Sequence, residues 1–241
     1  MALKAFFNWS GGKDSALALY HILNNSDYSV EKLLTNINDQ FGRISMHGVR
    51  EILLKQQAEA IGISLQKIFL GDQPSMSEYE TQMSKTLNRL HQENFTHSVF
   101  GDIFLEDLKK YRENQLSKCG MSAVFPLWKK DTTELIHQFI NLGFKTVVVC
   151  VNEKFLDKSF CGRIIDKDFI NDLPQNVDVC GENGEFHTFV FDGPLFKKPV
   201  AFTKGEMVYR KYAAPKQPDN NCFQAVTAEN YGFYFCDLLP V

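Results

Sequence analysis

The sequence lacks the features that mark several common classes of protein. No Walker motif, G-x-x-x-x-G-K-[ST], occurs among the 241 residues, which excludes that form of nucleotide site. The 6 cysteines are scattered without a C-x-x-C pair, which favours free thiols in a reducing cytosol. Apolar runs such as Thr146–Val151 are far too short to span a bilayer, and Gly11 and Gly12 come too early for a secretory signal. We therefore expect a cytoplasmic protein with no membrane segment.

Neither sign of charge dominates the sequence. Lys and Arg number 26 against 29 Asp and Glu, which gives a net charge of −3. A dominant nucleic-acid surface is normally strongly basic, so we do not expect a nucleic-acid partner, although a local basic groove is compatible with this charge. Hydrophobic residues make up 44% and charged residues 23%, as in ordinary globular proteins. The length is enough for one large domain or two modest ones.

Strand-like and helix-like segments alternate through the first half of the chain. The strand-like segments are Leu3–Trp9, Val30–Asn36, Leu65–Leu70, Ser98–Asp102 and Ala123–Phe125. The helix-like segments are the one that starts near Ser15, Val49–Ile61 closed by Gly62, Ser77–Glu93, and Asp107–Lys118 closed by Cys119-Gly120. This order predicts an α/β fold with a parallel, five-stranded, Rossmann-like sheet that is covered by helices on both faces.

The second half of the chain changes character. A helix at Thr132–Leu142 and a buried strand at Lys145–Val151 continue the earlier rhythm, and aromatic strands follow. These strands are Phe186–Phe191, Val200–Thr203, Met207–Tyr212 and Tyr231–Asp237, with an exposed loop expected at Ala213–Asn221. We place a boundary near Pro126, which predicts one domain at residues 1–126 and a smaller α+β domain at residues 127–241.

The segment Ser10-Gly11-Gly12-Lys13-Asp14-Ser15, called the glycine loop below, is the most informative part of the sequence. It stands where the first strand turns into a helix, and its two glycines let a ligand approach the backbone closely. The unpaired N–H groups of a helix N-terminus, the hydroxyl groups and the Lys13 cation together suit a polyphosphate. An ordinary Gly-Gly turn that opens a helix is the alternative interpretation.

Other candidate residues follow from the expected sheet. The carboxyl ends of parallel strands meet at one edge, where ligands bind in such folds. This rule places the glycine loop, Asn36–Ile37 and Gly101-Asp102 along the same edge. Asp102 is a candidate Mg²⁺ ligand, because a carboxylate there can hold the metal against phosphate oxygens; capping the next helix is its alternative role.

Three further polar side chains lie on or next to the predicted helices. His47 opens a helix, and it either approaches the ligand or makes a structural hydrogen bond. Arg112 and Glu113 lie on a polar helix face and are expected to form a solvated pair.

A second unusual segment, Cys180-Gly181-Glu182-Asn183-Gly184-Glu185-Phe186-His187-Thr188, is called the polar loop below. Two carboxylates, an amide, an imidazole and a hydroxyl lie beside two glycines, which suits a polar substrate. A carboxylate or imidazole there can take a proton from an attacking amine. A polar hairpin turn is the alternative, because Glu-Asn-Gly-Glu has good turn chemistry.

Several of these segments resemble a known family. The glycine loop resembles the SGGKDS loop of the PP-loop ATP pyrophosphatases, which split ATP between its α- and β-phosphates. Further stretches resemble the diphthine–ammonia ligase family in the same order: Val99–Ile103, Phe125–Trp128, Gly181–Val190 and Asp192–Phe196. The resemblance implies an ATP-binding domain of the adenine nucleotide alpha hydrolase (HUP) type and a substrate-binding C-terminal domain. It also implies that ATP adenylates the carboxylate of diphthine on an elongation factor, and that free ammonia displaces AMP.

The sequence departs from the family pattern in the polar loop. Eukaryotic members read closer to Glu-Gly-Gly-Glu-Tyr-Glu-Thr, whereas Asn183 and His187 stand at two of those positions here. The His-containing form resembles prokaryotic members, and bacteria are not expected to make diphthamide. The resemblance therefore implies the chemistry more firmly than the acceptor.

Residue roles follow from combining the motifs with the resemblance. ATP and Mg²⁺ are the expected cofactors; ammonia and a carboxylate-bearing acceptor, a modified elongation factor in the family, are the other partners, and a homodimer is considered. The predicted catalytic residues are Lys13, Asp14 and Glu185. ATP binding is predicted for Ser10, Gly11, Gly12, Lys13, Asp14, Ser15, Asn36, Ile37, His47 and Gly101. Acceptor binding is predicted for Glu182, Asn183, Glu185, His187 and Thr188.

Two other functions stay open at this stage. One is a PP-loop ATP pyrophosphatase that modifies transfer RNA; its thiolases generally use paired cysteines, which this chain lacks, and the acidic charge fits such a partner poorly. The other is a nucleotide-binding protein without turnover, against which the retained Lys13, Asp14 and Ser15 argue.

Overall fold

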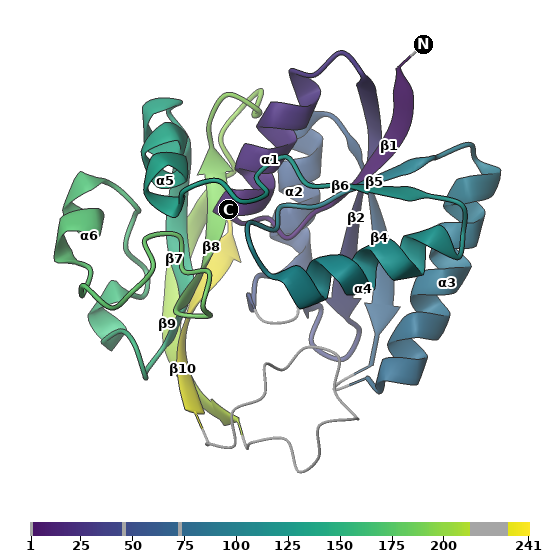
Figure 1. Cartoon of the computed structure of the whole chain (residues 1–241). Coiled ribbons are helices and arrows are strands. Elements are labelled where there is room, and N and C mark those ends of the chain that lie inside the picture. The colour runs from purple at the N-terminus through teal and green to yellow at the C-terminus, as the bar shows by residue number, and fades with distance from the viewer. Residues whose placement is uncertain (1, 45–46, 72–73, 213–230) are drawn as a thin grey trace.

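Two β-sheets, with helices between them and outside them, make up the molecule (Figure 1). The computed structural model describes residues 2–44, 47–71, 74–212 and 231–241. The loop predicted at Ala213–Asn221 lies outside the described residues. Among the residues that are described, no helix is long and apolar enough to cross a membrane.

The first sheet contains the five parallel strands that the sequence predicted. They are β1 (Leu3–Asn8), β2 (Tyr28–Asn38), β4 (Ser64–Leu70), β5 (His97–Val99) and β6 (Ser122–Val124), in the order β4-β2-β1-β5-β6. A short sixth strand, β3 (Arg43–Ile44), pairs antiparallel with the end of β2. The sequence analysis missed β3. It arises because Asn38 Oδ1 accepts hydrogen bonds from the backbone of the next turn, where Gly42 has a φ of 58°.

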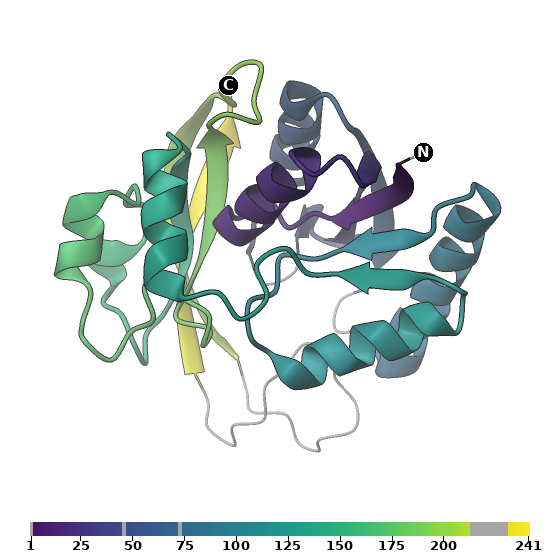
Figure 2. The ribbon, with the colours of Figure 1, turned by 45° about the horizontal axis from the view of Figure 1, so that its top comes forward.

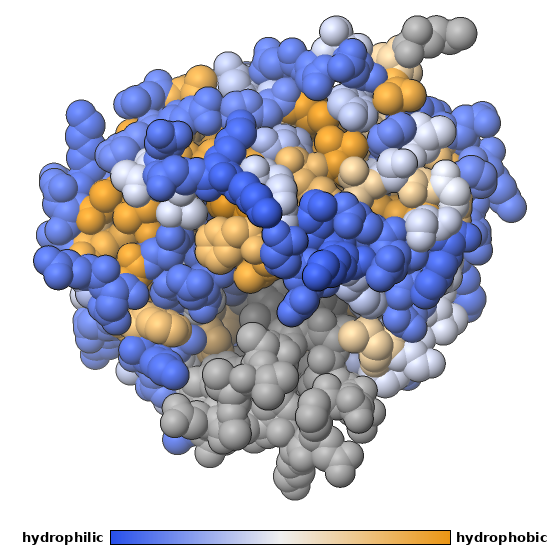
Figure 3. Space-filling view, viewed as in Figure 1, coloured by the Kyte–Doolittle hydropathy of each residue, from blue (hydrophilic) through white to orange (hydrophobic). Residues whose placement is uncertain are grey.

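Helices cover both faces of this sheet. They are α1 (Lys13–Leu23), α2 (Glu51–Ile61), α3 (Met76–Gln92) and α4 (Glu106–Ser117). The helices α1 and α2 lie between the two sheets, whereas α3 and α4 lie on the far side of the first sheet (Figures 1 and 2). The left-handed Gly62 ends α2 as predicted. Over α4 the surface is mainly hydrophilic (Figure 3).

The second sheet is antiparallel and is built entirely from the second half of the chain. Its strands are β7 (Lys145–Asn152), β8 (Phe186–Asp192), β9 (Phe202–Tyr212) and β10 (Tyr231–Pro240), in the order β8-β7-β10-β9. Helices α5 (Thr132–Asn141) and α6 (Lys167–Asp172) and a 3₁₀ turn, η1 (Lys158–Phe160), stand on its outer side (Figure 2). The two strands predicted at Val200–Thr203 and Met207–Tyr212 are one strand, β9, because Gly205 lies at a bulge and does not end the pairing.

One apolar core joins the two sheets. It contains Phe7 from β1, Leu54 from α2, Val149 from β7 and Phe189 from β8, all of them buried. A second, smaller core fills the space between the first sheet and the helices α3 and α4. The two halves of the chain therefore share a core, and the boundary near Pro126 stays a prediction about domain organisation.

Candidate active site

The glycine loop connects the carboxyl end of β1 to α1. Because Gly12 provides no side-chain cap, the first N–H groups of α1 are left for other partners. The N–H of Lys13 donates to Thr188 Oγ1 at 3.0 Å. In the part of the chain that the structure describes, no acceptor is found for the N–H groups of Asp14 and Ser15. Two backbone donors at the positive end of α1 are therefore available to an anion.

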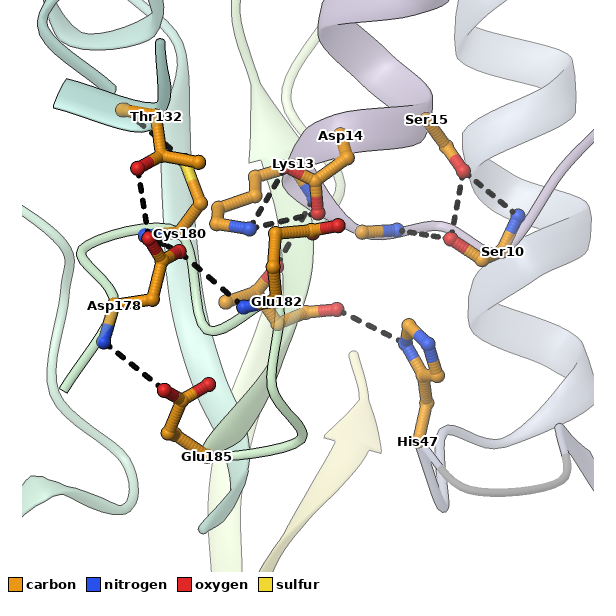
Figure 4. A network of polar contacts seen from close by, with 12 residues as sticks. Ser10, Lys13, Asp14, Ser15, His47, Thr132, Asp178, Cys180, Glu182 and Glu185 are labelled. Atoms are coloured by element: carbon orange, nitrogen blue, oxygen red, sulfur yellow. Dashed lines mark hydrogen bonds and ion pairs between the residues drawn. The ribbon is translucent and has the colours of Figure 1, made fainter. Parts of the chain in front are cut away.

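The hydroxyl groups of the loop are bonded to each other. Ser10 Oγ and Ser15 Oγ lie 2.7 Å apart, and the N–H groups of Ser10 and Gly12 donate to Ser15 Oγ and Ser10 Oγ at 3.3 Å each (Figure 4). These hydrogen bonds keep the loop in one conformation, and the hydroxyl that accepts in the Ser10–Ser15 pair can still turn its proton toward another acceptor.

The two glycines make room for the protein's own chain. Gly11 has a φ of 78°, and a Cβ there would lie 2.8 Å from Gln57 Oε1 and 2.9 Å from Leu54 Cδ2. A Cβ on Gly12 would lie 3.2 Å from His47 Cε1 and 3.3 Å from the carbonyl oxygen of Thr188. In this conformation α2, His47 and β8 occupy the space in front of the two glycines, and the contact of these glycines with a ligand stays a prediction.

Gln57 of α2 holds the glycine loop against β8. Its Nε2 donates to the carbonyl oxygens of Gly11 at 3.0 Å and Val190 at 2.6 Å, and its Oε1 accepts from Trp9 Nε1 at 2.9 Å. The N–H of Val190 also donates to the carbonyl of Gly11 at 2.9 Å. Sequence reasoning missed this fully buried residue. Gln57 is a polar residue within the apolar stripe of the predicted helix Val49–Ile61, and this position could have indicated that its side chain is buried and hydrogen-bonded.

The carboxylate of Glu185 is used inside the polar loop. It is fully buried, and it accepts from the N–H of Asp178 at 3.0 Å, the N–H of Asn183 at 2.8 Å and Asn183 Nδ2 at 3.1 Å. The exposed side chain of Asn183 is thereby directed back toward its own loop. Glu185 was predicted to be catalytic and to bind the acceptor; in the structure its oxygens instead accept from donors of its own turn, and its role in the reaction stays a prediction.

Asp178 supports the other side of the polar loop, and the sequence analysis missed it. It accepts from the N–H groups of Cys180 at 2.9 Å and Glu182 at 3.3 Å, and from Thr132 Oγ1 at 2.7 Å. The Cys180 thiol donates to the carbonyl of Thr132 at 3.3 Å (Figure 4). The backbone around Glu182 is thus fixed to the start of α5.

Lys13, Asp14 and Glu182 face one another where the two loops meet (Figure 4). Lys13 Nζ is buried and lies 2.8 and 2.7 Å from the two carboxylate oxygens of Asp14. Burial alone would lower the pKa of Lys13, but the nearby Asp14, Cys180 and Glu182 raise it overall. Burial, together with the charge of Asp14, raises the pKa of Glu182 to about 8. The junction therefore pairs a permanent cation with a carboxyl group that titrates near neutral pH.

Two histidines stack beside this junction. The rings of His47 and His187 have centroids 4.6 Å apart at an interplanar angle of 23°, and His47 Nδ1 lies 3.4 Å from the carbonyl oxygen of Thr188. Burial lowers the pKa of His47 to about 4 and lowers that of His187 as well. Both imidazoles are therefore neutral at pH 7, and neither adds positive charge to the site.

The remaining residues of the predicted edge differ in their surroundings. Ile37 is buried in the core, so only its backbone can contact a ligand. Asn36, at the end of β2, has a buried Oδ1 with no hydrogen-bond partner among the described residues. A Cβ on Gly101 would lie 3.1 Å from the backbone of Asp14 and Ser15, so this glycine lets the β5 end pack against α1.

Asp102 pairs with Arg112. The guanidinium group forms an ion pair with its carboxylate and lies 4.3 Å from the centroid of the Phe100 ring. The expected pair between Arg112 and Glu113 is wrong, since Glu113 instead lies 2.7 Å from Lys109. No group of three or more His, Cys, Asp or Glu side chains in the described ranges is arranged to hold a metal ion. Asp102 is thus already neutralised by an arginine.

Exposure differs from residue to residue at the junction. The Lys13, Ser15 and Thr188 side chains are buried, whereas the Asp14 side chain is 29% exposed. Two surface hollows of about 390 and 540 Å³, lined by residues from α2, β3, β4 and the neighbouring loops, contain none of the predicted site residues.

Both halves of the chain match domains of one known family. The description "Diphthamide synthase N-terminal domain" applies to a match over residues 3–123, and "Diphthamide synthase C-terminal domain" to a match over residues 131–214. The chain belongs to the diphthamide synthase family. The glycine loop lies in the first matched range and the polar loop in the second, together with β7, β8 and β9, whereas β10 lies outside both ranges.

The chain is also similar to proteins named diphthine–ammonia ligase. The chain is 26% identical over 219 residues to the diphthine–ammonia ligase of Schizosaccharomyces pombe, an alignment that covers 83% of this chain and 36% of the yeast protein. It is 24% identical over 224 residues to that of Danio rerio, which covers 83% of this chain and 86% of the fish protein. This member of the diphthamide synthase family thus spans about a third of one relative and most of the other.

One solved structure shows a weak likeness. It is a U34-tRNA thiolase from Methanococcus maripaludis, with 19% identity, a TM-score of 0.36, and coverage of 58% of this chain and 57% of the thiolase chain. At that level of similarity it carries no argument about the diphthamide synthase fold or its function.

Proposed function

We propose that this chain is an ATP-dependent, AMP-forming ligase that adenylates a substrate carboxylate and transfers ammonia to it. Membership of the diphthamide synthase family and the named diphthine–ammonia ligases among its relatives support this proposal. The main structural support is that Lys13 and Asp14 of the glycine loop lie next to Glu182 of the polar loop. The acceptor that the family name implies is diphthine on an elongation factor.

The glycine loop is the proposed phosphate site. The free N–H groups of Asp14 and Ser15, the hydroxyl groups of Ser10 and Ser15, and the Lys13 ammonium supply the donors that a polyphosphate needs. The unpartnered Asn36 Oδ1 at the same sheet edge is an acceptor suited to the exocyclic amino group of adenine. Because His47 and the carbonyl oxygen of Thr188 lie close to Gly12, a phosphate that contacts this glycine requires them to move away.

Mg²⁺ fits the charges of this junction. The pKa of Glu182 is raised by burial and by the carboxylates of Asp14, Asp102 and Asp178, so negative charge exceeds what Lys13 compensates. Mg²⁺ is usually held by one or two carboxylates together with phosphate oxygens, and Asp14 would hold it here in preference to the arginine-paired Asp102. When bound, it would neutralise phosphate charge.

Lys13 serves the first step of the proposed reaction. An acceptor carboxylate attacks the α-phosphorus of ATP, and the bond to pyrophosphate breaks. Negative charge then grows on the leaving pyrophosphate, beside a buried cation that stays protonated because its pKa is raised. Asp14 holds the ammonium in place through both of its carboxylate oxygens.

Glu182 serves the second step. Ammonia attacks the acyl carbon, the bond to AMP breaks, and the nitrogen must lose a proton to become an amide. A carboxylate with a pKa of about 8 is well matched to accept that proton near neutral pH. Glu185 cannot take this role without releasing the donors that fix the turn. His187 and Thr188 stay proposed acceptor contacts, with Thr188 also supporting Lys13.

Sulfur transfer is less well supported than amide formation. It needs a reactive thiolate, and burial raises the pKa of Cys150, Cys161, Cys180 and Cys236. Cys180 lies closest to the junction, and its thiol already donates to the carbonyl of Thr132.

The proposal is tested by measuring pyrophosphate release with ATP, ammonium and a purified elongation factor that carries diphthine. Chromatography of the nucleotides should show AMP, and the modified factor should gain an amide. A dominant ADP peak would contradict the proposed chemistry. Pyrophosphate release with other carboxylate acceptors but not with diphthine would keep the chemistry and change the acceptor.

A further inference from the structure

The strand β9 presents a long, bare edge. It is the outermost strand of the second sheet, and in the part of the chain that the structure describes it pairs with β10 alone. Three consecutive apolar side chains at its centre are well exposed: Met207 at 47%, Val208 at 39% and Tyr209 at 45%. An edge strand of 11 residues with exposed apolar groups offers unpaired N–H and C=O groups to another strand, which proteins usually avoid.

The opposite edge of the same sheet is protected. There, the N–H of Val190 in β8 donates to the carbonyl oxygen of Gly11 in the glycine loop. Gln57 Nε2 donates to the carbonyl oxygens of both residues. Within the described residues no comparable element is paired with the outer edge of β9. The β8 edge of the second sheet is therefore covered by the glycine loop, whereas the β9 edge has no such cover among the described residues.

The sequence of β9 is complementary to itself when it is reversed. In an antiparallel pair of two β9 strands with Val208 opposite Val208, Glu206 stands opposite Arg210 and Met207 stands opposite Tyr209. Each of these pairs occurs twice because of the twofold axis. Opposite charges and apolar–aromatic pairs directly across two strands are both stabilising. The nearest other registers with a twofold axis, centred on Met207 or on Tyr209, would place Val208 opposite Glu206 or Arg210 and would lose this match.

We propose that β9 pairs with β9 of a second copy of this chain, in the register centred on Val208. The two four-stranded sheets then form one continuous sheet across the dimer. A second copy fits this edge better than an unrelated peptide, because the charges and the apolar side chains are arranged symmetrically about one residue. The glycine loop and the polar loop lie beyond the other end of the sheet, so the pairing leaves the proposed active site accessible.

Charge reversal tests the register. Sedimentation at micromolar concentrations should show a dimer for the unchanged protein. Either Glu206→Arg or Arg210→Glu places like charges opposite each other twice and should weaken the dimer about tenfold or more. The double variant Glu206→Arg with Arg210→Glu restores opposite charges and should restore the dimer. A monomeric unchanged protein, or a dimer that tolerates both single variants, overturns the proposal.

Cysteine substitution tests the axis independently. Val208→Cys should give a disulfide-linked dimer on mild oxidation, because directly opposite Cβ atoms in an antiparallel pair lie about 5 Å apart. Glu206→Cys is the matched control, since its copies are offset by four residues, roughly 13 Å along the strand, and should not crosslink. Crosslinking of Glu206→Cys in place of Val208→Cys would contradict this register. Nucleotide turnover should be unchanged in both variants.

Discussion

The glycine loop and the polar loop are both rich in polar groups, but they are held in opposite ways. The glycine loop is held from outside, by Gln57 of α2 and by Thr188 and Val190 of β8. The polar loop is held from inside, where Glu185 accepts from donors of its own turn. Lys13 of the glycine loop, which is bonded to Asp14, and Glu182 of the polar loop face each other. Residues of two equally polar loops therefore differ in how much of their hydrogen-bonding capacity the fold already uses.

The largest expected effect comes from removing the charge of the glycine loop. Lys13→Met should lower turnover about 10³-fold, because the leaving pyrophosphate loses its buried cation. ATP affinity should fall less, since the backbone donors remain. Lys55→Met, on the exposed surface of α2, is the matched control and should keep normal turnover. Normal turnover in Lys13→Met, measured by pyrophosphate release, would place the phosphates elsewhere.

Glu182→Gln should lower turnover about 10²-fold while leaving the fold intact, because only the proton acceptor is lost. In the unchanged protein the rate should rise as pH rises through about 8, where Glu182 deprotonates, and this dependence should disappear in the variant. A rate profile identical to that of the unchanged protein would exclude Glu182 as the base.

The same variant has a stability signature. The folded pKa of Glu182 is raised from 4.5, so its favourable contribution is present below pH 4.5 and is lost as pH rises through about 8. Glu182→Gln should therefore gain thermal stability relative to the unchanged protein across that interval. A difference that does not change with pH would mean that the carboxyl group is not buried against Asp14.

Glu185→Gln is expected mainly to lower the stability of the folded protein. One of its two oxygens is replaced by an NH₂ group that faces a buried donor, which should lower the free energy of unfolding by about 2 kcal/mol. Glu59→Gln, on an exposed helix face, is the control and should change stability little. Urea unfolding measures both. A stable Glu185→Gln variant with no turnover would restore the catalytic role that the sequence analysis assigned to it.

The first sheet and its helices could be predicted because their signals are local. Alternating strands and helices, the glycine after α2 and the strand–glycine–helix order all lie within short segments. The joining contacts are not local: Lys13 and Thr188 are 175 residues apart, and Trp9 and Gln57 are 48 apart. No sequence periodicity relates positions so far apart. The contacts of Gln57 and the inward direction of the Glu185 side chain could therefore not be predicted from the sequence.

The arginine partner of Asp102 was hidden for a similar reason. Arg112 and Glu113 are adjacent in sequence, but on a helix neighbouring residues point in different directions, and residues four apart meet instead. Glu113 accordingly pairs with Lys109, and Arg112 turns toward the end of β5. The candidate segments were predictable, whereas the choice of which carboxylate faces the junction required the folded chain.

The smallest expected effect lies at the bond that joins the two loops. Thr188→Val keeps the shape of the side chain but removes the acceptor of the Lys13 N–H, which leaves a buried donor unpaired. We expect a loss of about 1 kcal/mol in the free energy of unfolding and a modest loss of ATP affinity. Thr188→Ser keeps the hydroxyl group and should bind ATP normally, with only the packing of one methyl group lost. If Thr188→Ser lost ATP affinity as much as Thr188→Val, the packing of the methyl group, and not the hydrogen bond from the Lys13 N–H, would hold the two loops together.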